Sequence, residues 1–258
     1  MRISLDFTKS AQKNAEDYYN LAKKSERKAL GAEASIKRME KELTAQQGQK
    51  PKEKPTQMRK NTEWYEEYNW FFTPRGELAI GGRSAKQNEA INSKYFEERD
   101  MFFHADIFGA SVVVLKGGAS ASKESKELAA QFAACFSSGW AEGTFSLNVY
   151  ALGRKQVSKS KQKGSLGTGS FLLEGEREWY KNVPLSLCAY LSKDKKGEDR
   201  FTVAPQKILA YGVAPENHVI IAPGTAKKSD AAKAISKKLG FADMDYIMQH
   251  LPAGGFSV

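Results

Sequence analysis

His104 and Asp106 are the residues of this sequence whose types and spacing most directly suggest chemistry, because they stand two apart at the end of an apolar run. Residues i and i+2 of an extended strand lie on the same face, so we expect the imidazole and the carboxylate side by side. Such a pair could transfer a proton or bind a hydroxyl group such as a ribose 2′-OH. A His and an Asp at a strand end more often have a structural role, so we assign no catalytic residue and expect a binding protein rather than an enzyme.

Residues 154–163 form a second candidate site, which is strongly cationic. The segment contains five Lys and Arg and no acidic residue, with hydroxyl and amide side chains between them. It cannot be part of a core, and it suits the phosphate backbone of a nucleic acid. From this segment and the glycine-rich stretch beyond it we predict RNA contacts by Arg154, Lys155, Gln156, Ser158, Lys159, Lys161, Lys163 and Ser170. The alternative is a charged loop that only keeps the protein soluble.

Residues 81–89 combine paired glycines with cations. Glycines let backbone amides approach a ligand closely, and the N-terminus of the helix expected to follow favours an anion. A plain strand-to-helix turn explains the glycines equally well. From this segment and from residues 104–111 we add the following to the predicted RNA-binding set: Arg83, Lys86, Asn88, His104, Asp106, Phe108 and Ser111.

Composition argues against other kinds of site. The chain has no Gly-x-x-x-x-Gly-Lys-Ser/Thr motif, and its three His and two Cys provide no paired metal ligands, so we expect no metal and no other cofactor. Cys135 and Cys188 are too few for a disulfide framework and fit a reducing cytosol, and Cys135 is expected in the core. No stretch approaches the roughly 20 apolar residues of a membrane span, so we expect a soluble cytoplasmic protein with no membrane partner.

The charge of the chain is unevenly distributed. Forty Lys and Arg against thirty Asp and Glu give a net charge of +10. The excess lies in residues 1–60 and 153–163, on either side of a mildly acidic body. A polyanionic partner would favour this arrangement, because contacts with phosphates release counterions. A solvated basic surface without a partner is the alternative.

The N-terminal part of the chain is predicted to be one long helix. From Ser10, a plausible N-cap, to about residue 47 there is no proline and one glycine. Steps of three and four separate the small and apolar residues Ala15, Tyr18, Ala22, Ala29, Ala32, Ile36, Met39 and Leu43, with Ser25 as the single interruption. Such a heptad seam predicts a coiled coil with a partner helix. A helix packed flat on its own domain is the alternative.

The remaining chain, from about residue 63, is predicted to be α+β. Apolar runs bounded by turn residues predict strands at 68–73, 77–81, 101–104, 111–116, 144–150, 170–175, 185–191, 207–213 and 218–222. Helical patterns are found at 84–98, 123–138, 227–239 and 244–251. This order does not alternate strand and helix, so we expect a mixed β-sheet with packed helices, preceded by the long coiled-coil helix.

Five segments in this order resemble the RNA-binding domain family of NFACT proteins, NFACT-R, in its archaeal form. They are Trp64-Tyr65-Glu66 to Trp70-Phe71, Ile80-Gly81-Gly82-Arg83 with Gln87-Asn88-Glu89, His104-Ala105-Asp106 with Gly109-Ala110-Ser111, Gln156-Val157-Ser158-Lys159, and Gly169-Ser170-Phe171. The helix is similar to the coiled coil that precedes this domain in archaeal members. We therefore divide the chain into a coiled-coil arm (1–47), a flexible linker (48–62), an NFACT-R domain (63–184) and a C-terminal extension packed on that domain (185–258).

The resemblance implies a protein of ribosome-associated quality control, which binds tRNA and the rRNA of the large ribosomal subunit at stalled translation complexes. It also implies a stand-alone form, because the N-terminal domain of full-length relatives has no counterpart here. A separate NFACT N-terminal protein, or a second copy bound through the arm, is then a possible partner. Phe108 stands where the family usually has histidine, and it could stack on a base instead.

Two other functions fit the same residues. A tRNA-modification accessory protein or enzyme is suggested by His104 and Asp106 beside a glycine-rich segment. A coiled-coil scaffold without a nucleic-acid role is suggested by the helix alone.

Overall fold

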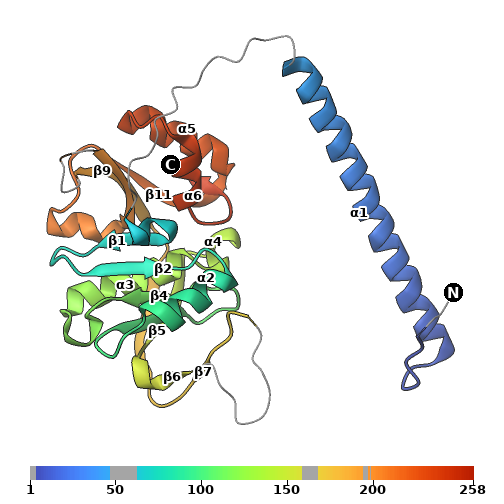
Figure 1. Ribbon diagram of the computed structural model, residues 1–258, viewed down its shortest axis with the longest axis horizontal. Coiled ribbons are helices and arrows are strands. Elements are labelled where there is room, and N and C mark those ends of the chain that lie inside the picture. Colours follow the sequence, from blue (N-terminus) through green and yellow to red (C-terminus); the bar gives the residue numbers. More distant parts are fainter. Residues whose placement is uncertain (1–3, 47–62, 159–167, 194–196, 198) are drawn as a thin grey trace. The chain divides into compact units, whose positions relative to one another are not determined.

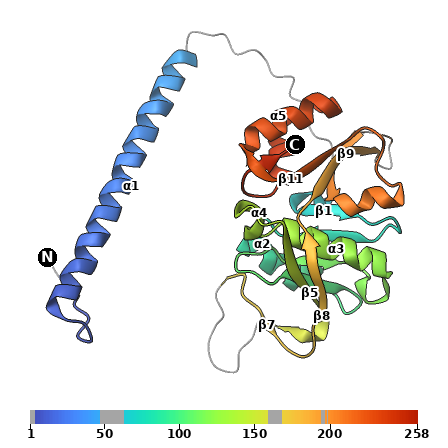
Figure 2. The same cartoon turned by 180° about the vertical axis from the view of Figure 1, so that it is seen from behind.

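The computed structural model describes residues 4–46, 63–158, 168–193, 197 and 199–258. The chain forms two compact units, Met1–Asn61 and Thr62–Val258, and Figures 1 and 2 show each from two sides. The linker predicted at residues 48–62 lies outside the described residues.

The first unit contains the long helix that the sequence predicts, α1 (Ala11–Gln46). The hydroxyl of Ser10 accepts a hydrogen bond from the backbone N–H of Lys13, as an N-cap does. The buried side chain of Asn14 accepts from the backbone N–H of Asp6 and donates to the carbonyl of the same residue, at 2.9 and 3.0 Å. The amide of Asn14 thereby holds the segment before α1 against the first turns of the helix.

The coiled-coil nature of α1 stays a prediction. Tyr18 and Ile36, on the predicted seam, are 41% and 55% exposed. The side chains of Ala32, Met39 and Leu43 lie outside the described part of the chain.

The second unit is built on two main antiparallel sheets. The larger has six strands in the order β1-β2-β4-β3-β5-β8, the smaller has four in the order β10-β9-β11-β12, and β6 and β7 form a separate ladder. The strands of the larger sheet are β1 (Asn69–Phe72), β2 (Leu78–Gly81), β3 (Met101–Ala105), β4 (Val113–Leu115), β5 (Ser146–Gly153) and β8 (Glu178–Pro184). The others are β6 (Val157–Ser158), β7 (Leu172–Leu173), β9 (Leu187–Lys193), β10 (Asp199–Pro205), β11 (His218–Ala226) and β12 (Phe256–Ser257).

Helices and helical turns connect these strands. The α-helices of this unit are α2 (Ala85–Ala90), α3 (Lys123–Cys135), α4 (Ser138–Ala141), α5 (Lys228–Leu239) and α6 (Met244–His250). The short turns are η1 (Trp64–Glu67), η2 (Ile91–Tyr95), η3 (Gly118–Ser120), η4 (Arg154–Gln156) and η5 (Gln206–Tyr211). The serine hydroxyls of Ser84 and Ser122 cap α2 and α3.

The predicted α+β class is confirmed, whereas the predicted mixed sheet is wrong. Every pair of neighbouring strands among the residues described is antiparallel. The unit β4-α3-β5 does contain two strands that point the same way, but β3 lies between them and pairs with both. No parallel pair therefore forms at this crossover.

Individual elements also differ from the prediction. The apolar run 207–213 is not a strand but the helical turn η5, with Ile208 buried, and the turn ends at Gly212, whose φ is +66°. The strands β8 and β10 have no counterpart among the predicted strands, because charged residues interrupt their apolar pattern. The hairpin predicted around Gly76 is confirmed as β1-β2.

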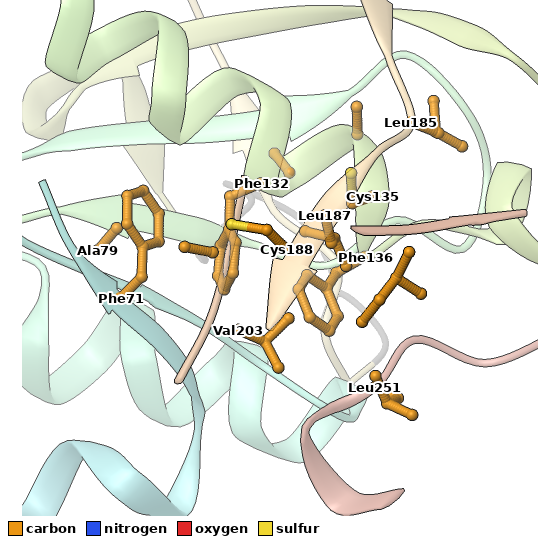
Figure 3. Packing of buried hydrophobic residues seen from close by; sticks show 14 of the residues in the cluster. Phe71, Ala79, Phe132, Cys135, Phe136, Leu185, Leu187, Cys188, Val203 and Leu251 are labelled. Atoms are coloured by element: carbon orange, nitrogen blue, oxygen red, sulfur yellow. The ribbon is translucent and has the colours of Figure 1, made fainter. Parts of the chain in front are cut away.

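Helix α3 lies at the centre of the main core, between the two sheets. The sequence shows an apolar stripe of Leu128, Phe132 and Cys135, which predicts one covered face. The residues between them are buried as well, because the second sheet covers the other side of the helix. Figure 3 shows Phe132 and Cys135 among side chains of both sheets, which include Phe71, Ala79, Leu187, Cys188 and Val203.

The face of the six-stranded sheet opposite α3, which we call the outer face, carries a second apolar cluster. Its buried members are Tyr65, Tyr68, Trp70, Ile80, Ile91, Phe96, Phe102, Val112, Val114, Tyr150, Leu152 and Val157. Elements η1, η2 and the β6-β7 ladder contribute residues to this cluster. These elements leave part of β8 uncovered, as the exposure of Trp179 shows.

The C-terminal residues 185–258 share the main core with the preceding segment. Arg200 on β10 also reaches η1, where its guanidinium donates to the Tyr65 hydroxyl at 2.7 Å and lies 3.1 Å from a carboxylate oxygen of Glu66. The compact unit accordingly runs from Thr62 to Val258.

Candidate nucleic-acid interface

Residues 81–89 and 104–111, two of the predicted segments, are held together by internal hydrogen bonds. The Ser111 hydroxyl donates to the carbonyl of Gly82 at 2.5 Å. The side-chain oxygen of Asn88 accepts from the backbone N–H of Val112 at 3.2 Å. A Cβ at position 82 would lie 2.1 Å from that Asn88 oxygen, so the close approach requires glycine here. Asn88 and Ser111 thus support the fold around the site.

Arg83 is also engaged inside the protein. Its guanidinium donates to the carbonyls of Glu66 and Tyr68, to the side-chain oxygen of Asn69 and to Nε2 of His250, at 2.7 to 3.2 Å. Burial lowers the pKa of Arg83 from its ordinary value. These contacts direct the guanidinium to η1, β1 and α6, so we leave Arg83 out of the proposed RNA contacts.

Gln156 and Arg154, at the start of the cationic segment, likewise have protein partners. The Gln156 amide donates to the carbonyls of Glu174 and Glu176 and accepts from the backbone N–H of Gly153. The guanidinium of Arg154 donates to the Val157 carbonyl at 2.7 Å and lies over the ring of Phe96. Gln156 therefore orients the β6-β7 ladder, from which the cationic segment continues.

Gly169 and Ser170, in the glycine-rich stretch beyond the cationic segment, lie at the start of α2. Gly169 has a φ of +80°, and a Cβ there would lie 2.8 Å from Cβ of Ala85. The exposed Ser170 is therefore close to the N-terminal turn of α2, which also carries the exposed Lys86. The tertiary structure brings these two segments together although more than 80 residues separate them in sequence.

His104 belongs to a row of three aromatic side chains across the outer face. In the register of β3, β5 and β8, His104 lies opposite Tyr150 and Tyr150 lies opposite Trp179. Successive ring centroids are 5.7 and 5.6 Å apart. The Tyr150 hydroxyl lies 3.2 Å from Nδ1 of His104. We call these three residues the aromatic row.

Charged groups flank the aromatic row. The guanidinium of Arg177 lies over the ring of Tyr150, 4.4 Å from its centroid, and 5.9 Å from that of Trp179. Asp106 is exposed, and its carboxylate is close enough to raise the pKa of His104. Burial has the larger, opposite effect and lowers the pKa of His104, so the imidazole is neutral at neutral pH. A neutral imidazole, a carboxylate, a guanidinium and an exposed indole thus share one surface.

The predicted site residues therefore divide into three groups. Side chains that hydrogen-bond within the protein are those of Arg83, Asn88, His104, Ser111, Arg154 and Gln156, and among these Asn88 is buried. The other described residues are wholly or partly open to solvent: Lys86, Asp106, Phe108, Lys155, Ser158 and Ser170. Lys159, Lys161 and Lys163 lie outside the described residues.

The sequence did not lead to a prediction of Tyr150, Arg177 or Trp179 as site residues. The signal that could have found them is Arg177 and Trp179 at i and i+2, which share a face once the segment is extended. The acidic residues beside them hide the strand pattern.

No group of three or more His, Cys, Asp or Glu that could hold a metal ion is found among the described residues. In the same part of the chain, no helix is both long and apolar enough to cross a membrane.

A sheet face with aromatic and cationic side chains is typical of nucleic-acid-binding domains. Residues 67–175 match the family described as the NFACT protein RNA binding domain, and this part of the chain belongs to that family.

Named relatives extend the match beyond this domain. The archaeal Rqc2 homolog aRqcH of Methanocaldococcus jannaschii is 34% identical over 206 residues, which cover 78% of this chain and 30% of that protein. The ribosome quality control complex subunit NEMF homolog of Drosophila melanogaster is 31% identical over 192 residues, which cover 72% of this chain and 19% of that protein. The chain thus spans less than a third of the length of these relatives.

Among solved structures, the C-terminal part of the fibronectin/fibrinogen-binding protein of Streptococcus suis aligns with a TM-score of 0.40 and 22% identity, over 58% of this chain and 57% of that one. A TM-score of this size supports no conclusion about fold or function.

Proposed function

We propose that this protein binds RNA and acts in ribosome quality control, with tRNA or the rRNA of the large ribosomal subunit as its RNA partner. The observation that carries the proposal is the match of residues 67–175 to an RNA-binding family, because this range includes the exposed residues Lys86, Asp106 and Lys155 of the candidate interface; Arg177 and Trp179 lie just beyond it. The relatives named as ribosome quality control proteins supply the process. The proposal concerns binding and assigns no chemical step to the protein.

The distribution of charge supports binding through the phosphate backbone. Lys86 is exposed on α2, and Lys155 is exposed on η4 at the start of the cationic segment. The three lysines of the segment 159–163 extend the same positive run in sequence. Phosphate contacts of this kind supply affinity for RNA of any sequence and make it dependent on salt.

The test is co-sedimentation with tRNA and with separated ribosomal subunits at two salt concentrations. The test variant replaces Lys155, Lys159, Lys161 and Lys163 with alanine. We expect the wild type to bind the large subunit or tRNA, and its log affinity to fall by about 0.7 to 0.9 per phosphate contact per log unit of salt. The variant should bind more weakly and show a smaller salt slope.

A matched control variant distinguishes the loss of this site from the loss of positive charge in general. Lys193, Lys233, Lys237 and Lys238 are exposed lysines on β9 and α5, and their replacement with alanine removes the same charge. The control variant should retain most of the binding. Equal losses in the two variants would contradict a localised site, and no binding by the wild type would contradict the proposed function itself.

A further inference from the structure

The aromatic row has the features of a surface that stacks on a base. Tyr150 is 6% exposed and forms the floor, whereas Trp179 is 44% exposed and lies on β8, at the end of the strand order. An exposed indole is costly to leave in water when it could be buried. The register places it beside Tyr150, at an interplanar angle of 66°, so the indole stands edge-on to the Tyr150 ring and stays partly open to solvent.

Charged groups at both sides of the row suit a nucleotide. Arg177 is exposed and already lies against the rings of Tyr150 and Trp179, where it can stack on a base or meet a phosphate. Asp106, in the bend directly after β3, is exposed and close enough to His104 to affect its pKa, and it offers a carboxylate to N–H groups of a base or to a ribose hydroxyl. These are the three chemical contacts that an unpaired nucleotide presents: a π-face, a phosphate and hydrogen-bond donors.

The β6-β7 ladder packs next to this row on the outer face. Phe171, at the start of β7, packs edge-on against Phe102, and Phe102 stacks on His104 with an interplanar angle of 8°. The β6-β7 ladder and the aromatic row therefore lie on the same face of the six-stranded sheet.

We propose that the His104-Tyr150-Trp179 row, with Arg177, binds one unpaired nucleobase of RNA, so that the protein prefers single-stranded or looped RNA to a duplex. The inference rests on the proposed RNA-binding function and adds the form of RNA that is selected. In a duplex the base faces are stacked on each other, so the row could not reach them without unstacking.

The experiment measures binding of fluorescent RNA to the full chain. The probes are a 12-nucleotide single strand and a hairpin whose stem contains the same sequence. The variants are Trp179→Ala, Trp179→Phe and, as a matched control, Phe145→Ala, because Phe145 is an exposed aromatic residue outside the row. Thermal unfolding of each variant checks that it is folded.

We expect Trp179→Ala to weaken binding of the single strand by about 5- to 150-fold, the range for loss of one stacked base. Trp179→Phe should restore most of the affinity, and Phe145→Ala should resemble the wild type. The affinity for the hairpin probe should change little in all three variants. A 2-aminopurine placed in the single strand should lose fluorescence on binding to wild type, and this loss should be smaller with Trp179→Ala.

Three results would overturn the inference. Equal affinity of the wild type for the strand and the stem would remove the preference for unpaired RNA. Unchanged affinity in Trp179→Ala, together with weaker co-sedimentation with ribosomal subunits, would show that the indole contacts a protein. Failure of the wild type to bind any RNA would instead overturn the proposed function on which the inference rests.

Discussion

Nη2 of Arg83 donates a hydrogen bond to Nε2 of His250 at 2.9 Å and joins residues 167 positions apart. Arginine has no acceptor, so Nε2 of His250 must accept, and Nδ1 then carries the proton that is donated to the Tyr246 carbonyl at 2.8 Å. The buried His250 is thereby set in one tautomer. A residue of the glycine-rich motif thus connects the first strands of the domain to its last helix.

Arg83→Ala should destabilise the second unit. The substitution leaves the Glu66 and Tyr68 carbonyls and Nε2 of His250 without this donor, at a cost of about 2 to 4 kcal/mol in the free energy of unfolding. The matched control is Lys86→Ala, at an exposed position three residues away, with an expected change within about 0.5 kcal/mol. Urea denaturation measures both. An Arg83→Ala protein of normal stability that binds RNA poorly would show instead that Arg83 contacts RNA.

Gly82→Ala should be more disruptive than Gly153→Ala. A Cβ at position 82 meets Asn88 at 2.1 Å, whereas the nearest atom to a Cβ at position 153 is 3.7 Å away. The backbone φ of Gly153 is −78°, which alanine adopts freely. We expect a loss of about 1 to 3 kcal/mol for Gly82→Ala and within about 0.5 kcal/mol for Gly153→Ala. Equal thermal midpoints would contradict the packing of Gly82 against Asn88.

His104 should make the second unit less stable in acid. Burial lowers the pKa of His104 in the folded chain, so the unfolded chain binds more protons once the pH falls below the ordinary histidine pKa of about 6.5. The stabilising contribution of the neutral imidazole is complete above that pH and is lost as the pH falls towards the lowered pKa. Denaturation from pH 7 to pH 5 should show a smaller loss of stability for His104→Gln than for the wild type. An equal loss of unfolding free energy in the two proteins between pH 7 and pH 5 would show that His104 does not contribute to the acid sensitivity.

Cys135 and Cys188 should be unreactive in the native protein. Burial raises the pKa of Cys188 to about 12 and that of Cys135 further, so neither forms the thiolate that reacts. The thiol of Cys188 donates to the carbonyl of Pro205, and the thiol of Cys135 donates to the carbonyl of Ser186. A disulfide reagent such as DTNB should titrate no thiol in the folded chain and both thiols in denaturant. Fast reaction of the native protein would contradict the burial shown in Figure 3.

Deletion of residues 1–61 should leave the second unit folded and reduce the size of any oligomer. The apolar clusters lie wholly between Tyr65 and Phe256, so the thermal midpoint should change little. The heptad seam of α1 predicts that the full chain self-associates, and sedimentation of both proteins tests this. A chain that is monomeric with and without the helix would exclude self-pairing through it.

The sequence was sufficient for the elements whose pattern is local. The long helix, the hairpin around Gly76, and the helices α3, α5 and α6 depend on caps, turn residues and periodicity that a short window contains. Strands β8 and β10 have charged residues within their apolar pattern, and the run 207–213 has strand-like composition but packs as a helical turn. Those three depend on neighbours that are distant in sequence.

The candidate site shows the same division in its side chains. By residue type and spacing alone, the sequence determined that a cationic segment follows β5. It predicted a shared strand face for His104 and Asp106, whereas β3 ends at Ala105 and Asp106 lies in the bend beyond it. Only the tertiary structure decided that Arg83 and Gln156 turn inward, because the carbonyl groups that bind them belong to other elements. It also decided the register that places Trp179 beside Tyr150. A charge or an aromatic ring is a property of one residue, whereas its exposure and its partners are set by how distant segments pack.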